Sequence, residues 1–142
     1  MKPILISTLL ILGLLATESC NKRVDDTKSP KDKTSELLLG AAWNIKTVVA
    51  DGTDQTTVFN GMTLSFNSTS YTTTNGGALW PSNGEWSYAD ESGKSLLRSD
   101  GLLVTIVDIA DNSLSLGLVS TKGSIGGRVN SVSGNYVFTF EK

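Results

Sequence analysis

The sequence predicts an all-β domain, an eight-stranded antiparallel up-and-down barrel that follows an export signal and a flexible tether. Two observations support this prediction. From Trp43 onward, apolar side chains recur at every second position in short runs, and Gly, Asn, Asp and Ser separate these runs, as is typical of strands joined by turns. No long segment beyond this point has the 3.6-residue apolar period of a helix. Eight sequential strands with short connections favour a closed barrel, with a two-sheet sandwich as the alternative.

The first 20 residues have the layout of a secretory signal that ends at the only cysteine of the chain. Lys2 precedes an apolar run from Ile4 to Ala16, and small and polar residues then lead to Cys20. As a helix, a run of about 13 residues would be roughly 20 Å long, which is short for a bilayer core of about 30 Å. The segment resembles a bacterial lipoprotein signal, which implies that Cys20 receives diacylglycerol and becomes the new N-terminus. The alternative is an ordinary signal peptide with a buried Cys20.

Three regions follow from this interpretation. Residues 1–19 are expected to be the signal peptide. Residues 20–36 comprise the lipidated cysteine and a charged, polar segment that should stay flexible because it has little apolar surface to bury. Residues 37–142 are enough for one small domain, and its first six residues are expected to form one helical turn or the lead into a strand. The implied location is the cell envelope, at the outer membrane, facing the periplasm or the cell surface.

Composition excludes several classes of function. The formal net charge is −2 and no basic face points to nucleic acid as a partner. The chain has no histidine, which removes the commonest general base and a common metal ligand. With Cys20 acylated, no thiol remains for catalysis or for zinc. We therefore expect no catalytic site, no metal site and no cofactor.

The period-two runs define eight expected strands. They span residues 43–50, 58–67, 70–74, 85–89, 95–98, 102–109, 113–119 and 135–141. In the first strand Trp43, Ile45 and Val49 should share one face. The residues expected to be mostly buried are Trp43, Leu64, Phe66, Trp86, Leu116, Tyr136 and Phe138.

Connection lengths predict a barrel with two different ends. The connections 51–57, 75–84 and 120–134 are long, whereas 68–69, 90–94 and 110–112 are short. In an up-and-down barrel these two sets lie at opposite ends, with the short 99–101 connection as the exception at the long-loop end. The expected shape is a cup.

Several short motifs resemble the lipocalin-like domains of Bacteroidota lipoproteins over residues 37–142. They are the segments 40–43 (GAAW), 62–67 (MTLSFN), 84–88 (GEWSY) and 114–116 (LSL). In lipocalins the Trp that begins the first strand plugs the closed end, and a basic residue near the end of the last strand packs on it; here these positions are Trp43 and Lys142. The resemblance implies barrel topology.

A loop motif and a filled interior define the candidate binding site. Leu79, Trp80 and Pro81 lie in the long 75–84 loop, so Trp80 is expected either to contact an apolar ligand or protein or to fold back over the open end. The large side chains expected to point inward predict a filled lower half; they are Trp43, Ile45, Met62, Leu64, Phe66, Trp86, Tyr88, Leu114, Leu116, Leu118, Tyr136, Phe138 and Phe140. We therefore expect a shallow pocket beneath Trp80, with Leu79 beside it and Arg128 reaching its rim.

Other motifs have simpler interpretations. The carboxylate pairs Glu85–Asp90 and Asp108–Asp111 are better explained by turn residues than by catalysis. The segment 123–128 lacks the helix and the lysine of a phosphate-binding loop. The expected function is binding of a small apolar or amphipathic ligand at the open end, and the alternative is a structural or protein-interaction module with a filled barrel.

Overall fold

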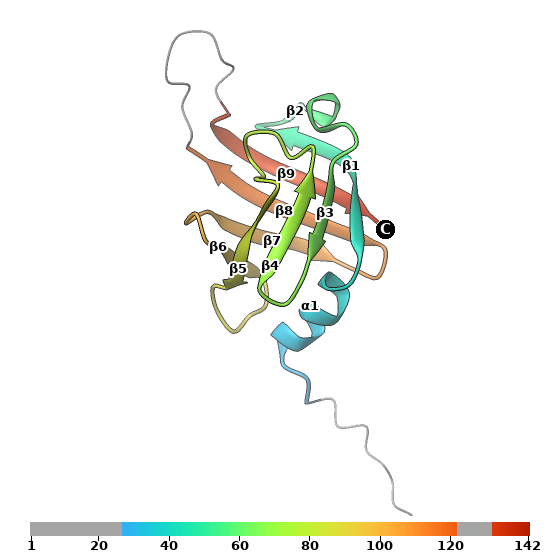
Figure 1. Ribbon diagram of the computed structural model, residues 1–142, viewed down its shortest axis with the longest axis vertical. Coiled ribbons are helices and arrows are strands. Elements are labelled where there is room, and N and C mark those ends of the chain that lie inside the picture. The colour runs from blue at the N-terminus through green and yellow to red at the C-terminus, as the bar shows by residue number, and fades with distance from the viewer. Residues whose placement is uncertain (1–26, 122–131) are drawn as a thin grey trace, which may run out of the picture.

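The strands of the protein form one antiparallel sheet that closes into a barrel (Figure 1). The computed structural model describes residues 27–121 and 132–142. Its strands are β1 (Ala42–Ala50), β2 (Thr53–Asp54), β3 (Thr63–Phe66), β4 (Ser70–Thr74), β5 (Asn83–Tyr88), β6 (Ser95–Arg98), β7 (Leu103–Ile109), β8 (Ser113–Ser120) and β9 (Gly134–Glu141). The predicted eight-stranded barrel is confirmed, and β2 is an additional short strand.

The long strand β1 closes the barrel because it pairs with two neighbours. Its first residues pair with β3, where Trp43 lies opposite Leu64. From Asn44 onward β1 pairs with β9, where Val48 lies opposite Phe138. This double pairing leaves no open edge along most of β1, which removes the edge that an open sheet would expose.

A β-bulge in β1 changes which residues point inward. The pairing with β9 shifts between Ile45 and Thr47, so Lys46 is an extra residue in the strand. After the bulge Val48 is fully buried, whereas Val49 is 37% exposed and Ile45 is half-buried. The prediction that Val49 shares the inner face with Trp43 is therefore wrong, because strict alternation does not hold across a bulge.

The segment before β3 is not the strand that its sequence suggested. Residues Thr56–Phe59 form a short 3₁₀ helix, η1, and β3 begins at Thr63 rather than at residue 58. The Asp54 carboxylate accepts a hydrogen bond from the Thr56 amide at 2.8 Å, and the Thr56 hydroxyl accepts one from the Val48 amide at 3.0 Å. These local bonds favour a turn over a strand. They also let Phe59 enter the core, where it is buried.

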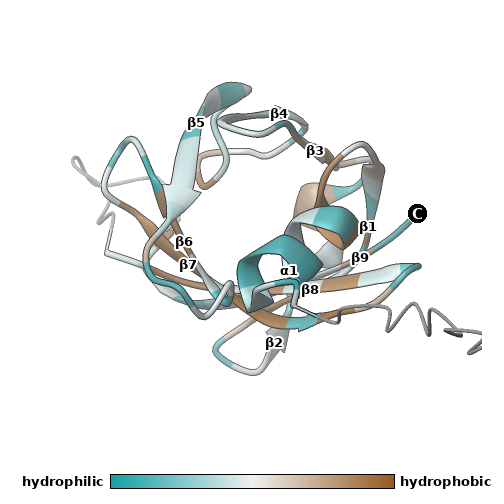
Figure 2. Cartoon of the chain, turned by 90° about the horizontal axis from the view of Figure 1, so that it is seen from below, coloured by the Kyte–Doolittle hydropathy of each residue, from teal (hydrophilic) through white to brown (hydrophobic). Residues whose placement is uncertain are grey.

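An α-helix, α1 (Pro30–Leu38), begins within the segment predicted to be a flexible tether. Its start has a capping box, in which the Ser29 hydroxyl accepts from the Asp32 amide and the Asp32 carboxylate accepts from the Ser29 amide, and Pro30 occupies a favoured first position. Leu38 is fully buried, so packing against the barrel orders a polar helix. Figure 2 shows α1 lying across one end of the barrel. In the part of the chain that the structure describes, no helix is both long and apolar enough to span a membrane.

The strand directions give the barrel a helix end and a loop end (Figure 1). The helix end carries α1 and the three short turns after β3, β5 and β7. The loop end carries the β1–β3, β4–β5, β6–β7 and β8–β9 connections. All seven residues predicted for the core are buried. Phe138 lies at the centre of the core, with its ring 5.1 Å from Phe59 and 6.2 Å from Trp80.

Candidate functional site

Trp80 fills the loop end of the barrel from the inside. Its side chain is only 2% exposed, as is that of Leu79. The indole meets Tyr71 edge to face at 5.6 Å and Phe138 at 6.2 Å. Of the two expectations for this loop motif, the structure shows the one in which Trp80 folds back over the open end. The expected surface contact is wrong for Trp80, and space beneath it is taken by Phe138.

The loop that carries Trp80 turns sharply because of its small residues. The Trp80 amide donates to the carbonyl of Gly76 at 3.1 Å, closing a tight turn. A Cβ atom on Gly76 would lie 2.4 Å from the Trp80 carbonyl oxygen and 2.5 Å from Trp80 Cβ. Asn75 and Gly77 both have positive φ angles, of 52° and 59°, which Asn and Gly tolerate best. The sequence of this loop therefore directs its indole inward.

A buried arginine, Arg98 at the end of β6, holds the two sides of the loop end together. It is 2% exposed and its Cζ lies 4.9 Å from the Trp80 ring centroid. Its Nη1 donates to the Leu79 carbonyl at 2.8 Å, its Nε donates to Asp100 Oδ1 at 3.2 Å, and its Nη2 pairs with Asp100 Oδ2. A buried charge needs such partners. Arg98 therefore ties the β4–β5 loop to the β6–β7 turn.

Some of the polar groups buried at the loop end lack a hydrogen-bond partner. Burial raises the pKa of the Tyr71 hydroxyl, and the nearby Arg98 charge acts in the opposite direction. Trp80 Nε1 and Thr73 Oγ1 are buried without a hydrogen-bond partner within residues 27–121 and 132–142. Each such group costs about 1–3 kcal/mol relative to a satisfied one. The packing of the Trp80 indole must offset this cost.

A small cavity opens at the loop end beside Leu79. Its volume is about 190 Å³, and it is lined by Leu79, Asp100, Gly101, Leu102, Ser120 and Thr121. Two of these residues are leucines, Asp100 is acidic, and Ser120 and Thr121 carry hydroxyl groups. Typical sites for drug-sized ligands begin at about 300 Å³, so this cavity is suited to a small ligand only. We call it the mouth cavity.

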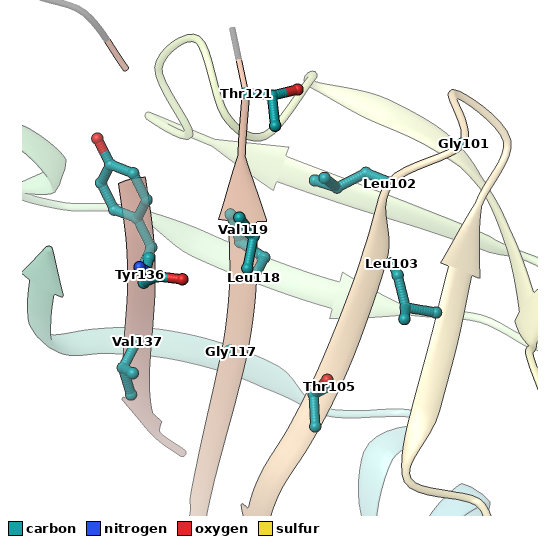
Figure 3. A pocket seen from close by; sticks show the side chains of 11 residues that line it. Gly101, Leu102, Leu103, Thr105, Gly117, Leu118, Val119, Thr121, Tyr136 and Val137 are labelled. Atoms are coloured by element: carbon teal, nitrogen blue, oxygen red, sulfur yellow. The ribbon is translucent and has the colours of Figure 1, made fainter. Parts of the chain in front are cut away.

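A larger hollow lies on the outer wall of the barrel, over β7, β8 and β9 (Figure 3). Its volume is about 560 Å³ and none of the described residues that line it is charged. Gly117 lies between Thr105 and Val137 in adjacent strands, and its missing side chain deepens the hollow. The exposed side chains of Leu103, Val119 and Val137 stand around it. We call this surface the wall groove; it shares Gly101, Leu102 and Thr121 with the mouth cavity.

The helix end is closed by aromatic side chains. Trp43 is fully buried, and its Nε1 donates to the Leu38 carbonyl of α1 at 3.1 Å. Lys142 Nζ lies 4.8 Å from the Trp43 ring centroid, within the range of a cation–π contact. The Tyr88 and Ser35 hydroxyl oxygens lie 2.8 Å apart, and burial raises the pKa of the Tyr88 hydroxyl. These contacts join α1 and the C-terminal residue to the aromatic side chains at the helix end.

The carboxylates near turns have local structural partners. Asp90 accepts hydrogen bonds from the amide and the hydroxyl of Ser92, and these bonds lower the pKa of its carboxyl group. Hydrogen bonds from Asn135 lower the pKa of the Asp51 carboxyl group in the same way. No group of three or more metal-ligating side chains occurs among the described residues. The turn interpretation of Asp90 is therefore supported by its contacts.

Of the four predicted site residues, the structure describes two, Leu79 and Trp80. Leu79 lines the mouth cavity, and Trp80 packs behind it against Arg98. Arg128 and Cys20 lie outside the described residues. Sequence reasoning missed Arg98, although Leu96 and Arg98 share the inward face of β6. The two-residue period of that strand was the available signal.

The protein is thus a closed antiparallel β-barrel with a filled interior and two hollows at its surface. No protein-family model matches the chain, and no curated protein matches it either.

Proposed function

We propose that this protein is a non-catalytic binding module of the cell envelope, built on a lipocalin-like barrel and anchored to the outer membrane by lipid on Cys20. The layout of residues 1–20 supports the anchor. The packing of Lys142 on Trp43 supports the lipocalin-like assignment, because it joins the last strand to the Trp of the closed end.

The proposed anchor would also orient the barrel. Helix α1 begins at Pro30, ten residues after Cys20. A chain of that length reaches at most about 35 Å from the lipid. The helix end would therefore lie near the membrane, and the loop end with its mouth cavity would face away from it.

The filled interior is the observation that favours an interaction module over a carrier of bulky ligands. Trp80, Phe138 and Phe59 occupy the upper lumen, where a lipocalin-type carrier would need space. An eight-stranded barrel has room for side chains or for one small ligand. Binding of a large partner is therefore assigned to the outside of the barrel.

The wall groove is the proposed contact surface for a protein partner. Val119 is 58% exposed and Leu103 is 49% exposed, although both are large apolar side chains. The centres of protein interfaces are depleted in charged residues, and the lining of this groove has that composition. Contiguous exposed apolar surface of this kind marks interaction sites.

Site-specific photo-crosslinking in cells tests this proposal. A photoreactive amino acid at Val119 should give a protein adduct of defined mass, and adding Val137→Lys should remove that adduct. The matched control is the same photoreactive residue at Val58, which is 66% exposed but does not line the groove. Equal adducts at both positions, or none at Val119, would refute the groove as the contact surface.

A second candidate function is binding of a small amphipathic ligand at the loop end. The mouth cavity of about 190 Å³ favours it, since both apolar and polar residues line it. Titration of an environment-sensitive fatty-acid probe into the wild type and Trp80→Ala tests it. Saturable binding that weakens in the variant supports this function, and no binding of varied apolar probes contradicts it.

A further inference from the structure

Two residues that line the mouth cavity are hydrogen-bonded to the same buried residue, Arg98. Arg98 is buried, and it donates to Asp100 on one side and to the Leu79 carbonyl on the other. Asp100 and Leu79 both line the cavity. Contacts with Trp80 at 4.9 Å and with Tyr71 at 5.7 Å hold the guanidinium in turn. One buried cation therefore links two residues of the cavity lining.

The β6–β7 turn presents the Asp100 carboxylate to the cavity. The Gly101 amide donates to the Arg98 carbonyl at 2.9 Å, and Gly101 has a φ of 86°, which suits glycine. The Leu102 amide donates to Asp100 Oδ1 at 3.3 Å. The Asp100 side chain remains 39% exposed while its partner Arg98 is buried. The buried Arg98 thus binds the Asp100 carboxylate, which itself remains partly exposed to solvent.

The chemistry of the lining selects a class of ligand. The charge of Arg98 offsets that of Asp100, so the pair gives little net attraction to an anion or to a cation. A charged ring would therefore lose hydration in the cavity without gaining a charged partner. Ser120 and Thr121 also line the cavity, and both carry a hydroxyl group, although Ser120 is only 5% exposed. Leu79 and Leu102 contribute an apolar surface that fits the C–H face of a ring.

We propose that the mouth cavity binds a small neutral polyol of about the size of one hexose ring. The volume of about 190 Å³ corresponds to roughly six water molecules at about 30 Å³ each. This inference rests on the small-ligand function proposed for the loop end and names its ligand class.

Saturation-transfer NMR with three hexose probes tests the ligand class, with the full chain in detergent at mildly acidic pH. The probes are glucose, glucosamine and glucuronate, which share one ring and differ in charge. Glucose should bind about fivefold or more tightly than glucuronate, and tighter than glucosamine. Transfer should be strongest to the ring C–H protons. Tighter binding of glucuronate or glucosamine, or no saturable binding of glucose, would overturn the proposal.

Two variants test the assigned roles. Asp100→Asn leaves the charge of Arg98 without its carboxylate partner, so glucuronate should then bind more tightly than glucose. Ser120→Ala keeps that ion pair and should weaken glucose several-fold without changing the order of the probes. Ser115→Ala on the outer face of the same strand is the matched control and should have no effect. An unchanged order in a folded Asp100→Asn, or equal effects of the two serine variants, would refute the site.

Further probes show whether the ligand is a free sugar or the end of a glycan chain. They also distinguish failure of the polyol inference from failure of the small-ligand function. Retained binding of maltotriose indicates the end of a glycan chain, and its loss indicates a free ring; either supports the ligand class. If the fatty-acid probe binds and is weakened by Trp80→Ala while glucose does not bind, the polyol inference fails and the small-ligand function stands. If neither probe binds, both fail.

Discussion

The indole of Trp80 lies against the guanidinium of Arg98, with Arg98 Cζ 4.9 Å from the ring centroid, inside the loop end of the barrel. Trp80 comes from the β4–β5 loop, whereas Arg98 is the last residue of strand β6. Their contact closes the barrel where a carrier would be open. The mouth cavity then lies outside this plug and depends on it for its shape.

A double-mutant cycle measures this contact. With Arg98→Met and Trp80→Leu as the single changes, we expect a coupling energy of about 0.5–2 kcal/mol, because a desolvated cation over an indole reaches that range. Urea denaturation gives the free energy of unfolding of the wild type, the two single variants and the double variant. The control cycle combines Arg98→Met with Trp43→Leu at the other end of the barrel and should give coupling near zero. Equal coupling in both cycles would contradict a specific contact.

The packing of β9 is tested by truncation at Phe138. Phe138→Ala should lower the free energy of unfolding by roughly 3–5 kcal/mol, since it removes a fully buried ring that contacts Phe59, Trp80 and Phe140. The neighbouring Val137 points outward and is 39% exposed. Val137→Ala is therefore the control and should cost less than about 1 kcal/mol. A loss below about 1 kcal/mol for Phe138→Ala would show that the core is not packed as described.

Sequence patterns predicted most of the sheet because nearly every strand has one apolar face. Residues 113–119 alternate strictly, and β8 spans Ser113–Ser120 with its leucines buried. Alternation cannot reveal a bulge, which is why Val49 was assigned to the inner face and the buried Val48 was not. The short strand β2 has no apolar face, so its pairing with β1 could not be predicted either.

The candidate site was harder to predict than the sheet. The sequence identified Leu79 and Trp80 as special, but not the contact of Trp80 with Arg98, which is 18 residues away in sequence. Helix α1 was missed for a related reason. Its composition is polar, and it is ordered by a cap at Ser29 and by docking of Leu38 on the barrel. The Trp80–Arg98 contact and the docking of Leu38 are tertiary contacts that periodicity does not record, whereas the Ser29–Asp32 capping box is a local pattern that the sequence does contain.

The N-terminal cap of α1 gives a direct test of that helix. Ser29→Ala removes the side-chain acceptor of the capping box and should destabilise α1 by about 0.5–2 kcal/mol. Hydrogen exchange of the α1 amides should become faster, while exchange in β8 stays unchanged. Thr27→Ala, at an exposed position before the cap, is the control. Unchanged exchange in Ser29→Ala would mean that docking alone holds the helix.

The proposed anchor is tested by Cys20→Ser. A diacylglycerol with an added acyl chain contributes several dozen CH₂ groups at about 0.8 kcal/mol each when buried, so the lipidated chain should stay with the membrane fraction. Cys20→Ser should move the domain to the soluble fraction in detergent-free fractionation. Ser7→Thr, within the apolar run and away from the cysteine, controls for general effects of changes in the signal. A membrane-bound Cys20→Ser protein would place the anchor elsewhere.

Acid should weaken the link between β1 and β9 that Asp51 makes. The Asp51 carboxylate accepts hydrogen bonds from the Asn135 side chain at 2.9 Å and the Asn135 amide at 3.0 Å, and these bonds hold the pKa of Asp51 below its ordinary value of 3.8. A carboxyl group whose pKa is lower in the folded state stabilises the fold above its unfolded pKa. That contribution is lost as the pH falls through the folded pKa.

The corresponding variant is Asp51→Asn, which suits the positive φ of 46° at this position. Urea denaturation at neutral pH should show the variant to be less stable than the wild type. The difference should begin to shrink as the pH falls below 3.8 and should vanish below the folded pKa of Asp51. In an Asn135→Ala background the neutral-pH difference should be smaller, because only the backbone donor remains. A difference that stays constant from neutral pH into acid would show that the charge of Asp51 does not stabilise this contact.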